Sequence, residues 1–250
     1  MDQPLIPALS VVGLEKRYGD VTAVGGLDVE VAPGEILGLV GPNGAGKTTT
    51  LRCLAGILPI TAGAVRIGGV DLASEPAKAK HGLAFLPDEP KLFEYLTVIE
   101  HLNFTARLYG VPDWADKAAR LLLELELESK RDALPGELSR GMKQKLQVAC
   151  GFLHDPKLVL LDEPLTGLDP AGIRKMKRLL VDRSASGGAI VLSSHLLQLV
   201  EELCSRILVI AGGKRVAFGT VAQIRAELGH ADDATLEEVF LAVTGSDGGG

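Results

Sequence analysis

The sequence contains few cysteines, few aromatic residues and no excess of basic residues. Its 250 residues include three cysteines, Cys53, Cys150 and Cys204, which lie far apart and match neither a CxxC motif nor the Cys/His spacing of a zinc site. This excludes a disulfide scaffold and indicates buried thiols in a reducing compartment. The net charge is −6 and no basic run is present. Because nucleic-acid binding depends on clustered positive charge, we expect no nucleic-acid partner.

Long hydrophobic runs are also missing. Hydrophobic residues make up 46% of the chain, yet no stretch approaches the roughly 18 consecutive apolar residues of a transmembrane helix. The first four residues lack the basic and apolar segments of a signal peptide. These features predict a cytoplasmic protein. The length permits one large domain, which we expect to span residues 1–245, followed by a disordered glycine-rich tail at 246–250.

The first third of the chain has the pattern of strands interrupted by one helix. Residues 9–35 contain short β-prone pieces separated by glycine and proline, which predict antiparallel strands. Residues 36–40 are continuously apolar, as in a strand covered on both faces. A helix is expected at 47–58, and short strands and turns are expected at 60–90.

The rest of the chain predicts helices followed by parallel strands. Helical patterns recur between about 91 and 157, and the expected helices are residues 97–109, 114–128 and 140–154. Helical segments then separate three apolar runs, which are residues 158–161, 189–192 and 207–210. This alternation is typical of parallel βαβ units. The chain is therefore predicted to be an α/β protein.

A glycine-rich segment follows the strand expected at residues 36–40. It matches G-x-x-x-x-G-K-[ST] and consists of Gly41, Pro42, Asn43, Gly44, Ala45, Gly46, Lys47 and Thr48, with Thr49 next in the chain. In such a loop the backbone N–H groups and the helix N-terminus contact phosphate oxygens, the lysine adds positive charge, and the Thr48 hydroxyl reaches Mg²⁺. The alternative is a glycine turn without a ligand. GTPases, kinases and many ATPases share this loop, so it predicts nucleotide binding alone.

Two apolar runs end in Asp-Glu-Pro. In the first, at 83–90, Pro87 removes a hydrogen-bond donor, which favours an edge strand or a loop. The second is unbroken, so we assign its Asp162 to Mg²⁺ and its Glu163 to polarising the attacking water. The alternative for both carboxylates is a solvated strand end. His195 ends the next predicted strand, where open α/β sheets bind ligands, although a structural polar histidine is an equal alternative.

These motifs occur together with Leu-Ser-Arg-Gly-Met at residues 138–142 and Thr-Gly-Leu-Asp at 166–169. In this order they make the chain similar to the nucleotide-binding subunit of ATP-binding cassette (ABC) transporters, from Tyr18 to about Gly219. The resemblance implies the P-loop NTPase fold of ABC ATPases. That fold has a RecA-like core, an N-terminal antiparallel β subdomain and a helical subdomain inserted at about 91–157. The resemblance also implies an ATPase that uses ATP and Mg²⁺.

The resemblance further implies that two copies close head to tail over two ATP molecules. Ser139 and Gly141, at the start of a helix, would then meet the γ-phosphate that the other copy binds. The roles implied for other residues are adenine stacking for Tyr18, catalysis for Lys47, general-base catalysis for Glu163, γ-phosphate contact for His195, and a place for Asp169 in the loop that joins the two sites.

Three residues depart from the family pattern. Arg140 and Met142 occupy signature positions where the family has glycine and glutamine in L-S-G-G-Q. Asp88 occupies the place of the glutamine in the family's Q-loop. A carboxylate there accepts hydrogen bonds from water or approaches Mg²⁺, so Asp88 is included among the expected metal-binding residues.

The segments 87–90, 139–144 and 235–240 resemble bacterial ABC-2-type exporter ATPases, which work with a separately encoded transmembrane permease. The chain is therefore expected to power export from the inner face of the cell membrane, with residues 95–108 as the docking surface for the permease. Two alternatives stay open. One is a soluble ABC-type ATPase in cofactor assembly or in nucleic-acid or ribosome-linked work, and the other is a regulatory nucleotide-binding module with little turnover.

Overall fold

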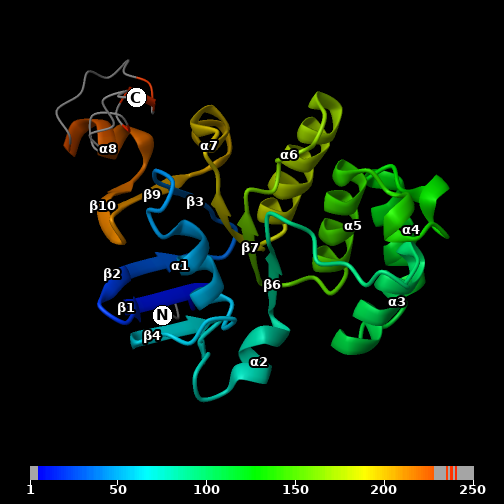
Figure 1. The fold of residues 1–250 in the computed structure, drawn as a ribbon, viewed down its shortest axis with the longest axis horizontal. Coiled ribbons are helices and arrows are strands. Elements are labelled where there is room, and N and C mark those ends of the chain that lie inside the picture. Colours follow the sequence, from blue (N-terminus) through cyan, green and yellow to red (C-terminus); the bar gives the residue numbers. More distant parts are fainter. Residues whose placement is uncertain (1–4, 228–234, 236, 239, 241–250) are drawn as a thin grey trace.

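A computed structural model of the chain describes residues 5–227, 235, 237, 238 and 240. The predicted tail at 246–250 lies outside these residues. Two β-sheets and their surrounding helices make up the described part (Figure 1). The strands are β1 (Leu9–Tyr18), β2 (Val21–Val31), β3 (Ile36–Val40), β4 (Ala62–Ile67), β5 (Val70–Asp71), β6 (Leu83–Leu86), β7 (Leu158–Asp162), β8 (Ala189–Ser193), β9 (Arg206–Ala211) and β10 (Lys214–Gly219). The helices are α1 (Lys47–Leu54), α2 (Pro76–His81), α3 (Val98–Tyr109), α4 (Trp114–Glu124), α5 (Arg140–Phe152), α6 (Pro170–Ala185), α7 (Leu197–Leu203) and α8 (Val221–Glu227), with short 3-10 helices at Glu128–Lys130 and Pro135–Glu137.

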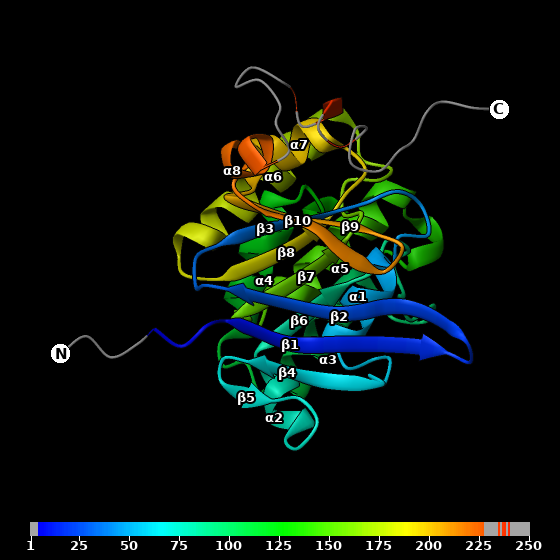
Figure 2. The ribbon, with the colours of Figure 1, turned by 90° about the vertical axis from the view of Figure 1, so that its left-hand side faces the viewer.

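The first sheet is antiparallel and has the strand order β2-β1-β4-β5. Figure 2 shows β2, β1 and β4 side by side. The short β-prone pieces expected between residues 9 and 35 join into two long strands. Register shifts between β1 and β2 make this possible, because they accommodate irregular residues such as Gly13 within a continuous pairing.

The second sheet has the order β10-β9-β3-β8-β7-β6. Its strands are parallel except for β10, which pairs antiparallel with β9. The prediction of an α/β protein with parallel strands in its second half is therefore confirmed. β6 is an edge strand, as Pro87 predicted. Because parallel strands end at the same edge, the residues that follow β3, β7 and β8 lie close together, and these residues form the site described below.

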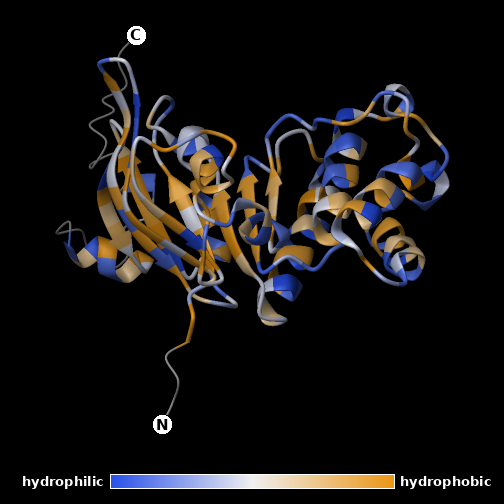
Figure 3. Ribbon diagram, turned by 90° about the horizontal axis from the view of Figure 1, so that it is seen from below, coloured by the Kyte–Doolittle hydropathy of each residue, from blue (hydrophilic) through white to orange (hydrophobic). Residues whose placement is uncertain are grey.

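Two large hydrophobic cores cover the two faces of this second sheet, and a smaller cluster around Val200, Ile207 and Val209 packs beside β9. The side chains of β7 point alternately into the two cores, since Leu158 and Leu160 face the first core while Val159 and Leu161 face the second. The first core contains α1 and the antiparallel sheet. The second contains α5, α6 and the helices α3 and α4. Figure 3 shows mainly hydrophobic strands and helices of mixed polarity, the pattern expected when each helix buries one face.

Several predicted helix ends were wrong. α1 ends at Leu54, before residue 58, because Gly56 adopts the left-handed conformation (φ 63°) and the Ile57 N–H donates to the Arg52 carbonyl. α4 ends at Glu124, before residue 128, where Glu126 has a positive φ of 58°. α5 ends at Phe152, two residues early.

Two helices, α2 and α8, were missed. α2 begins with Pro76 at its first position, within a segment where only strands and turns were expected.

The three cysteines are free in the structure. Cys53 is buried, but Cys150 and Cys204 are only partly buried, which corrects the expectation of three buried thiols. Within the described residues, no helix has both the length and the apolar character required to cross a membrane.

Candidate functional site

The glycine-rich loop joins β3 to α1, as the sequence predicted, and leaves the N-terminus of α1 open. The N-cap residue is Gly46, which has a φ of 102° and no side chain to cap the helix. The first turn contains no acidic residue. A Cβ atom at Gly46 would lie 2.5 Å from the Ala23 carbonyl oxygen, so only glycine fits here. The free N–H groups of the first turn are therefore available to an anion.

Lys47 is held inside this loop. Its side chain is buried, and its Nζ donates hydrogen bonds to the carbonyl oxygens of Gly41 at 2.6 Å and Pro42 at 3.2 Å. Burial lowers the pKa of the Lys47 ammonium, and the carboxylates of Glu163 and Asp162 oppose this shift. The loop therefore positions a cation at the N-terminus of α1 before any ligand is bound.

A cleft of about 290 Å³ adjoins the loop and α1. It brings together most of the predicted phosphate-binding residues with two carboxylates at the end of β7, Asp162 and Glu163. The residues that line it are Ala23, Asn43, Gly44, Ala45, Gly46, Lys47, Thr48, Thr49, Asp162 and Glu163. Gly41 and Pro42 contribute through their carbonyl groups, which hold Lys47.

Asp162 and Glu163 are fixed by the neighbouring strand β8. The Ser193 hydroxyl donates to Asp162 Oδ1 at 2.7 Å. The Glu163 N–H approaches both the carbonyl oxygen of Ser193 at 3.1 Å and its hydroxyl oxygen at 3.3 Å. Ser193 is fully buried, so these hydrogen bonds are shielded from solvent. Ser193 was not among the predicted site residues, although its position at the end of a parallel strand was a usable signal.

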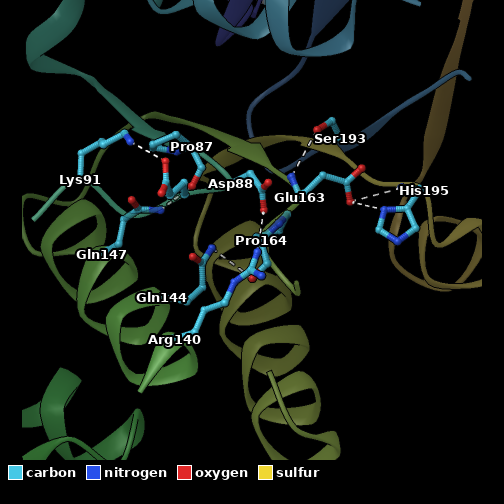
Figure 4. A network of polar contacts seen from close by, with 11 residues as sticks. Pro87, Asp88, Lys91, Arg140, Gln144, Gln147, Glu163, Pro164, Ser193 and His195 are labelled. Carbon is cyan, nitrogen blue, oxygen red and sulfur yellow. Dashed lines mark hydrogen bonds and ion pairs between the residues drawn. The ribbon is translucent and has the colours of Figure 1, made fainter. Parts of the chain in front are cut away.

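Glu163 and His195 form a contact at the rim of the cleft. His195 Nδ1 lies 2.8 Å from Glu163 Oε2, and the His195 N–H donates to the same oxygen at 3.4 Å (Figure 4). Glu163 also has a positive φ of 49°, which is rare for a residue with a side chain and costs about 1 kcal/mol. The hydrogen bonds to Ser193 and His195 hold Glu163 in this conformation.

The residues around the cleft fit a divalent cation that arrives with a nucleotide. Among the described residues, no group of three or more His, Cys, Asp or Glu side chains is arranged to hold a metal. The cleft does contain the Thr48 hydroxyl and the Asp162 carboxylate. A hydroxyl and a carboxylate are oxygen donors of the kind Mg²⁺ takes when phosphates supply further ligands. The donor set therefore fits Mg²⁺ bound together with phosphate.

Ser139 and Gly141 lie outside this cleft, at the start of α5. The exposed Ser139 is the N-cap, and its hydroxyl accepts from the Met142 N–H at 3.2 Å. The first turn of α5 packs against the loop between β7 and α6, since a Cβ atom on Gly141 would lie 3.1 Å from the Gly167 carbonyl oxygen. In the same loop, Asp169 caps α6 by accepting from the Gly172 N–H at 2.8 Å.

Asp88 and Tyr18 are also separate from the residues that line the cleft. Asp88 lies beyond the end of β6 and pairs with Arg140 at 3.7 Å. Its assignment as a metal ligand stays a prediction. Tyr18, at the end of β1, is half-exposed, and the Lys16 ammonium lies 4.8 Å from the centre of its ring. Its role in adenine stacking likewise stays a prediction.

Comparison with known proteins places these features in a family. Residues 24–166 match the model of the family described as "ABC transporter". The chain is 32% identical over 243 residues to "ABC-type transporter ATP-binding protein EcsA" of Bacillus subtilis (strain 168), covering 96% of this chain and 98% of that protein. It is 42% identical over 219 residues to "Nod factor export ATP-binding protein I" of Burkholderia pseudomallei (strain 1710b), covering 86% of this chain and 72% of the relative.

Solved structures show the same relationship. One, titled "Structure of ATP binding subunit of ABC transporter", aligns with a TM-score of 0.91 at 34% identity and covers 94% of this chain and 99% of its own. This likeness covers nearly the whole of both chains. The expected architecture, a RecA-like core with an antiparallel β subdomain and a helical insertion, is therefore confirmed.

Proposed function

The chain belongs to the ABC transporter family, and from this premise we propose that it binds and hydrolyses ATP to power export through a separate transmembrane permease. ATP-binding subunits of this family are ATPases, and this chain is one of them. The observation that carries the proposal is the cleft in which Lys47, Asp162 and Glu163 converge at the open N-terminus of α1.

The chain's own groups bind the phosphates of ATP. The free N–H groups of the first turn of α1 and the ammonium of Lys47 attract the β- and γ-phosphate oxygens, and the glycines of the loop let the backbone approach them closely. Thr48 and Asp162 would hold Mg²⁺, directly or through its water shell. When bound, this ion neutralises charge that develops on the phosphate oxygens. Ser193 keeps the Asp162 carboxylate in one orientation.

Glu163 accepts a hydrogen bond from the attacking water and so orients the water toward the terminal phosphorus. Its carboxylate is held by His195 at 2.8 Å. The same contact places the imidazole of His195 beside Glu163, from where it would contact the γ-phosphate. Positioning and charge stabilisation of this kind account for most of the catalysis of phosphoryl transfer.

A second copy of the chain completes the site. Ser139 is exposed at the start of α5, in a turn that packs against the loop ending at Asp169. Neither Ser139 nor Gly141 lines the cleft of its own chain. A head-to-tail dimer would bring this helix end to the γ-phosphate in the opposite cleft, and Tyr18 would stack on the adenine of its own cleft. ATP would then join the two copies and hydrolysis would release them.

A groove of about 270 Å³ between β6, α3 and α5 is the proposed docking surface for the permease. Phe93 and Phe104 line this groove. Their rings pack edge to face, with the ring centres 5.2 Å apart. Next to the groove, Tyr95 is 89% exposed and Leu108 is 67% exposed. Apolar side chains gathered in this way mark surfaces that another protein covers. This surface overlaps the segment 95–108, and a permease bound there would hold the chain at the inner face of the membrane.

Export is favoured over the soluble alternative by the names of the relatives. One is a Nod factor export protein and another is an ABC-type transporter protein. The alternative of a soluble ABC ATPase in cofactor assembly or nucleic-acid work has no comparable support.

The proposed mechanism is tested with Glu163→Gln. We expect the hydrolysis rate at saturating ATP to fall at least about a hundredfold, because the amide does not accept the proton of water as a carboxylate does. The variant should also form an ATP-dependent dimer on gel filtration. The matched control is Glu89→Gln, in the other Asp-Glu-Pro segment, where Glu89 is exposed and pairs with Lys91. Its hydrolysis should stay within twofold of the unchanged chain. Steady hydrolysis by Glu163→Gln, or no dimer under any condition, would contradict the mechanism.

The partner is tested by purifying Glu163→Gln from detergent-solubilised host membranes and identifying its companions by mass spectrometry. We expect one stoichiometric polytopic membrane protein. Adding Phe93→Asp should abolish recovery of this membrane protein, since a charged side chain in the groove opposes burial of the groove under the partner. Adding Leu123→Asp, on the exposed side of α4, is the control and should leave recovery unchanged. Equal recovery with both variants would place the docking surface elsewhere.

A further inference from the structure

Asp88 and Arg140, the two charged residues that differ from the family pattern, face each other. Asp88 follows β6, and Arg140 begins α5. A guanidinium nitrogen of Arg140 lies 3.7 Å from Asp88 Oδ1, and Figure 4 shows the two side chains pointing toward one another. Each replaces an uncharged residue of the family pattern. Because the charges are opposite and in contact, neither departure is isolated, and the two form one feature of the site.

The pair lies at the end of a row of contacts along α5. Arg140, Gln144 and Gln147 are spaced four and three residues apart, so they share one face of the helix (Figure 4). The Gln144 amide donates to the Pro164 carbonyl at 3.3 Å. The Gln147 amide donates to the Pro87 carbonyl at 2.8 Å. One face of α5 is thus attached both to the segment after β6 and to the segment that directly follows Glu163.

Arg140 contacts both of these segments at once. A Cβ atom on Gly167 would lie 3.0 Å from Arg140 Cδ and 3.1 Å from its Nε, so the stem of the side chain packs on the loop after β7. Asp88 Oδ1 is shielded from solvent and has no hydrogen-bond partner within the described chain. The Arg140 guanidinium is therefore the positive group that compensates this oxygen. Without Arg140, this shielded carboxylate oxygen would lack a neighbouring positive charge.

We propose that Asp88 and Arg140 form a positioning pair that fixes the first turn of α5 against the loop after β7. The pair sets the rate of ATP hydrolysis and leaves the affinity of the single chain for ATP unchanged. Both side chains are substantially exposed overall, at 48% for Asp88 and 61% for Arg140. Exposed ion pairs contribute little to folding stability, so the expected effect of the pair is on geometry. This inference rests on the proposed function, since it concerns the same reaction.

The test compares Asp88→Arg, Arg140→Asp and the double variant that exchanges the two charges. In the full chain, each single variant should lower kcat about tenfold, because like charges then face each other. The Kd for ATP, measured by calorimetry at a concentration where the chain is monomeric, should stay within twofold. The double variant should recover kcat to within threefold of the unchanged chain. Arg140→Lys, which retains the charge, should also stay within threefold.

Lys78→Glu is the matched control, because Lys78 takes part in an exposed ion pair with Glu75 on the distant helix α2. Its kcat should stay within twofold. Unchanged kcat in the single variants, or no recovery in the double variant, would overturn the proposal. Weaker ATP binding by Asp88→Arg that the double variant does not restore would instead assign Asp88 to the metal site.

Hydrogen exchange separates failure of this inference from failure of the proposed function. If the unchanged chain does not hydrolyse ATP, the proposed function fails, and the pair is then judged by exchange in the nucleotide-free chain. The amides at residues 142–144 should exchange faster in each single variant and return to the original rate in the double variant. Equal exchange rates of these amides in all variants would contradict the proposed positioning role of the pair.

Discussion

The N-termini of α1 and α5 present opposite solutions to the same problem, which is how to satisfy the free N–H groups of a helix end. α1 has Gly46 as its N-cap, no capping side chain, and the buried cation Lys47 at its first position. α5 has Ser139, whose hydroxyl accepts from the Met142 N–H, and it exposes both Ser139 and Arg140 to solvent.

This difference indicates where each helix end finds its ligand. α1 stands beside the carboxylates of Asp162 and Glu163, in a cleft that the chain builds by itself. α5 is capped internally and faces outward, so the single chain is stable without a ligand there. The N-terminus of α1 therefore lies within a cleft of its own chain, whereas the N-terminus of α5 is available to the second copy proposed above.

The largest expected effect comes from removing the cation of α1. Lys47→Ala should lower ATP affinity at least about a hundredfold, because the buried ammonium is the only full positive charge among the residues that line the cleft. The fold should persist, since the lysine hydrogen bonds stay within the loop. Calorimetry measures the affinity and circular dichroism the fold. Micromolar affinity in this variant would refute the role of the loop.

A smaller effect is expected at α5. Ser139→Arg should leave ATP binding by the single chain within twofold, because Ser139 does not line that chain's cleft. It should prevent the ATP-dependent dimer of Glu163→Gln and lower hydrolysis about thirtyfold in the otherwise unchanged chain. Gel filtration and a phosphate-release assay measure the two effects. The control is Ser186→Arg, at the exposed end of α6, which should dimerise normally. Weak ATP binding by the Ser139→Arg monomer would remove the distinction between the two helix ends.

How far the sequence predicted the site depends on how local each feature is. Lys47 and the loop around it were predictable because a phosphate loop is made of consecutive residues between a strand and a helix. Asp162 was predictable because an unbroken apolar run ends at it. The hydrogen bonds from Ser193 were not, since they depend on β7 and β8 being neighbours in the sheet.

The pairing of Asp88 with Arg140 was also beyond the sequence pattern. Each residue was recognised as a departure, but contact between them requires α5 to pack beside the end of β6. The helix ends were missed for a different reason. Glu126 adopts a left-handed conformation that no local propensity favours, and the chain turns there because Leu127 packs into the core.

α5 connects two distant places in the molecule. Thirteen residues give it a length of roughly 20 Å. Its first turn lies beside the loop after β7, while Cys150 and Gly151, near its other end, line the groove proposed for the permease. A tilt of about 10° around the Gln144 contact would move the far end by roughly 2 Å, since that contact lies near one third of the length. A displacement of that size shifts the wall of the groove by more than the radius of a carbon atom. A change in the angle of α5 near the loop after β7 would thus be felt as a displacement at the groove.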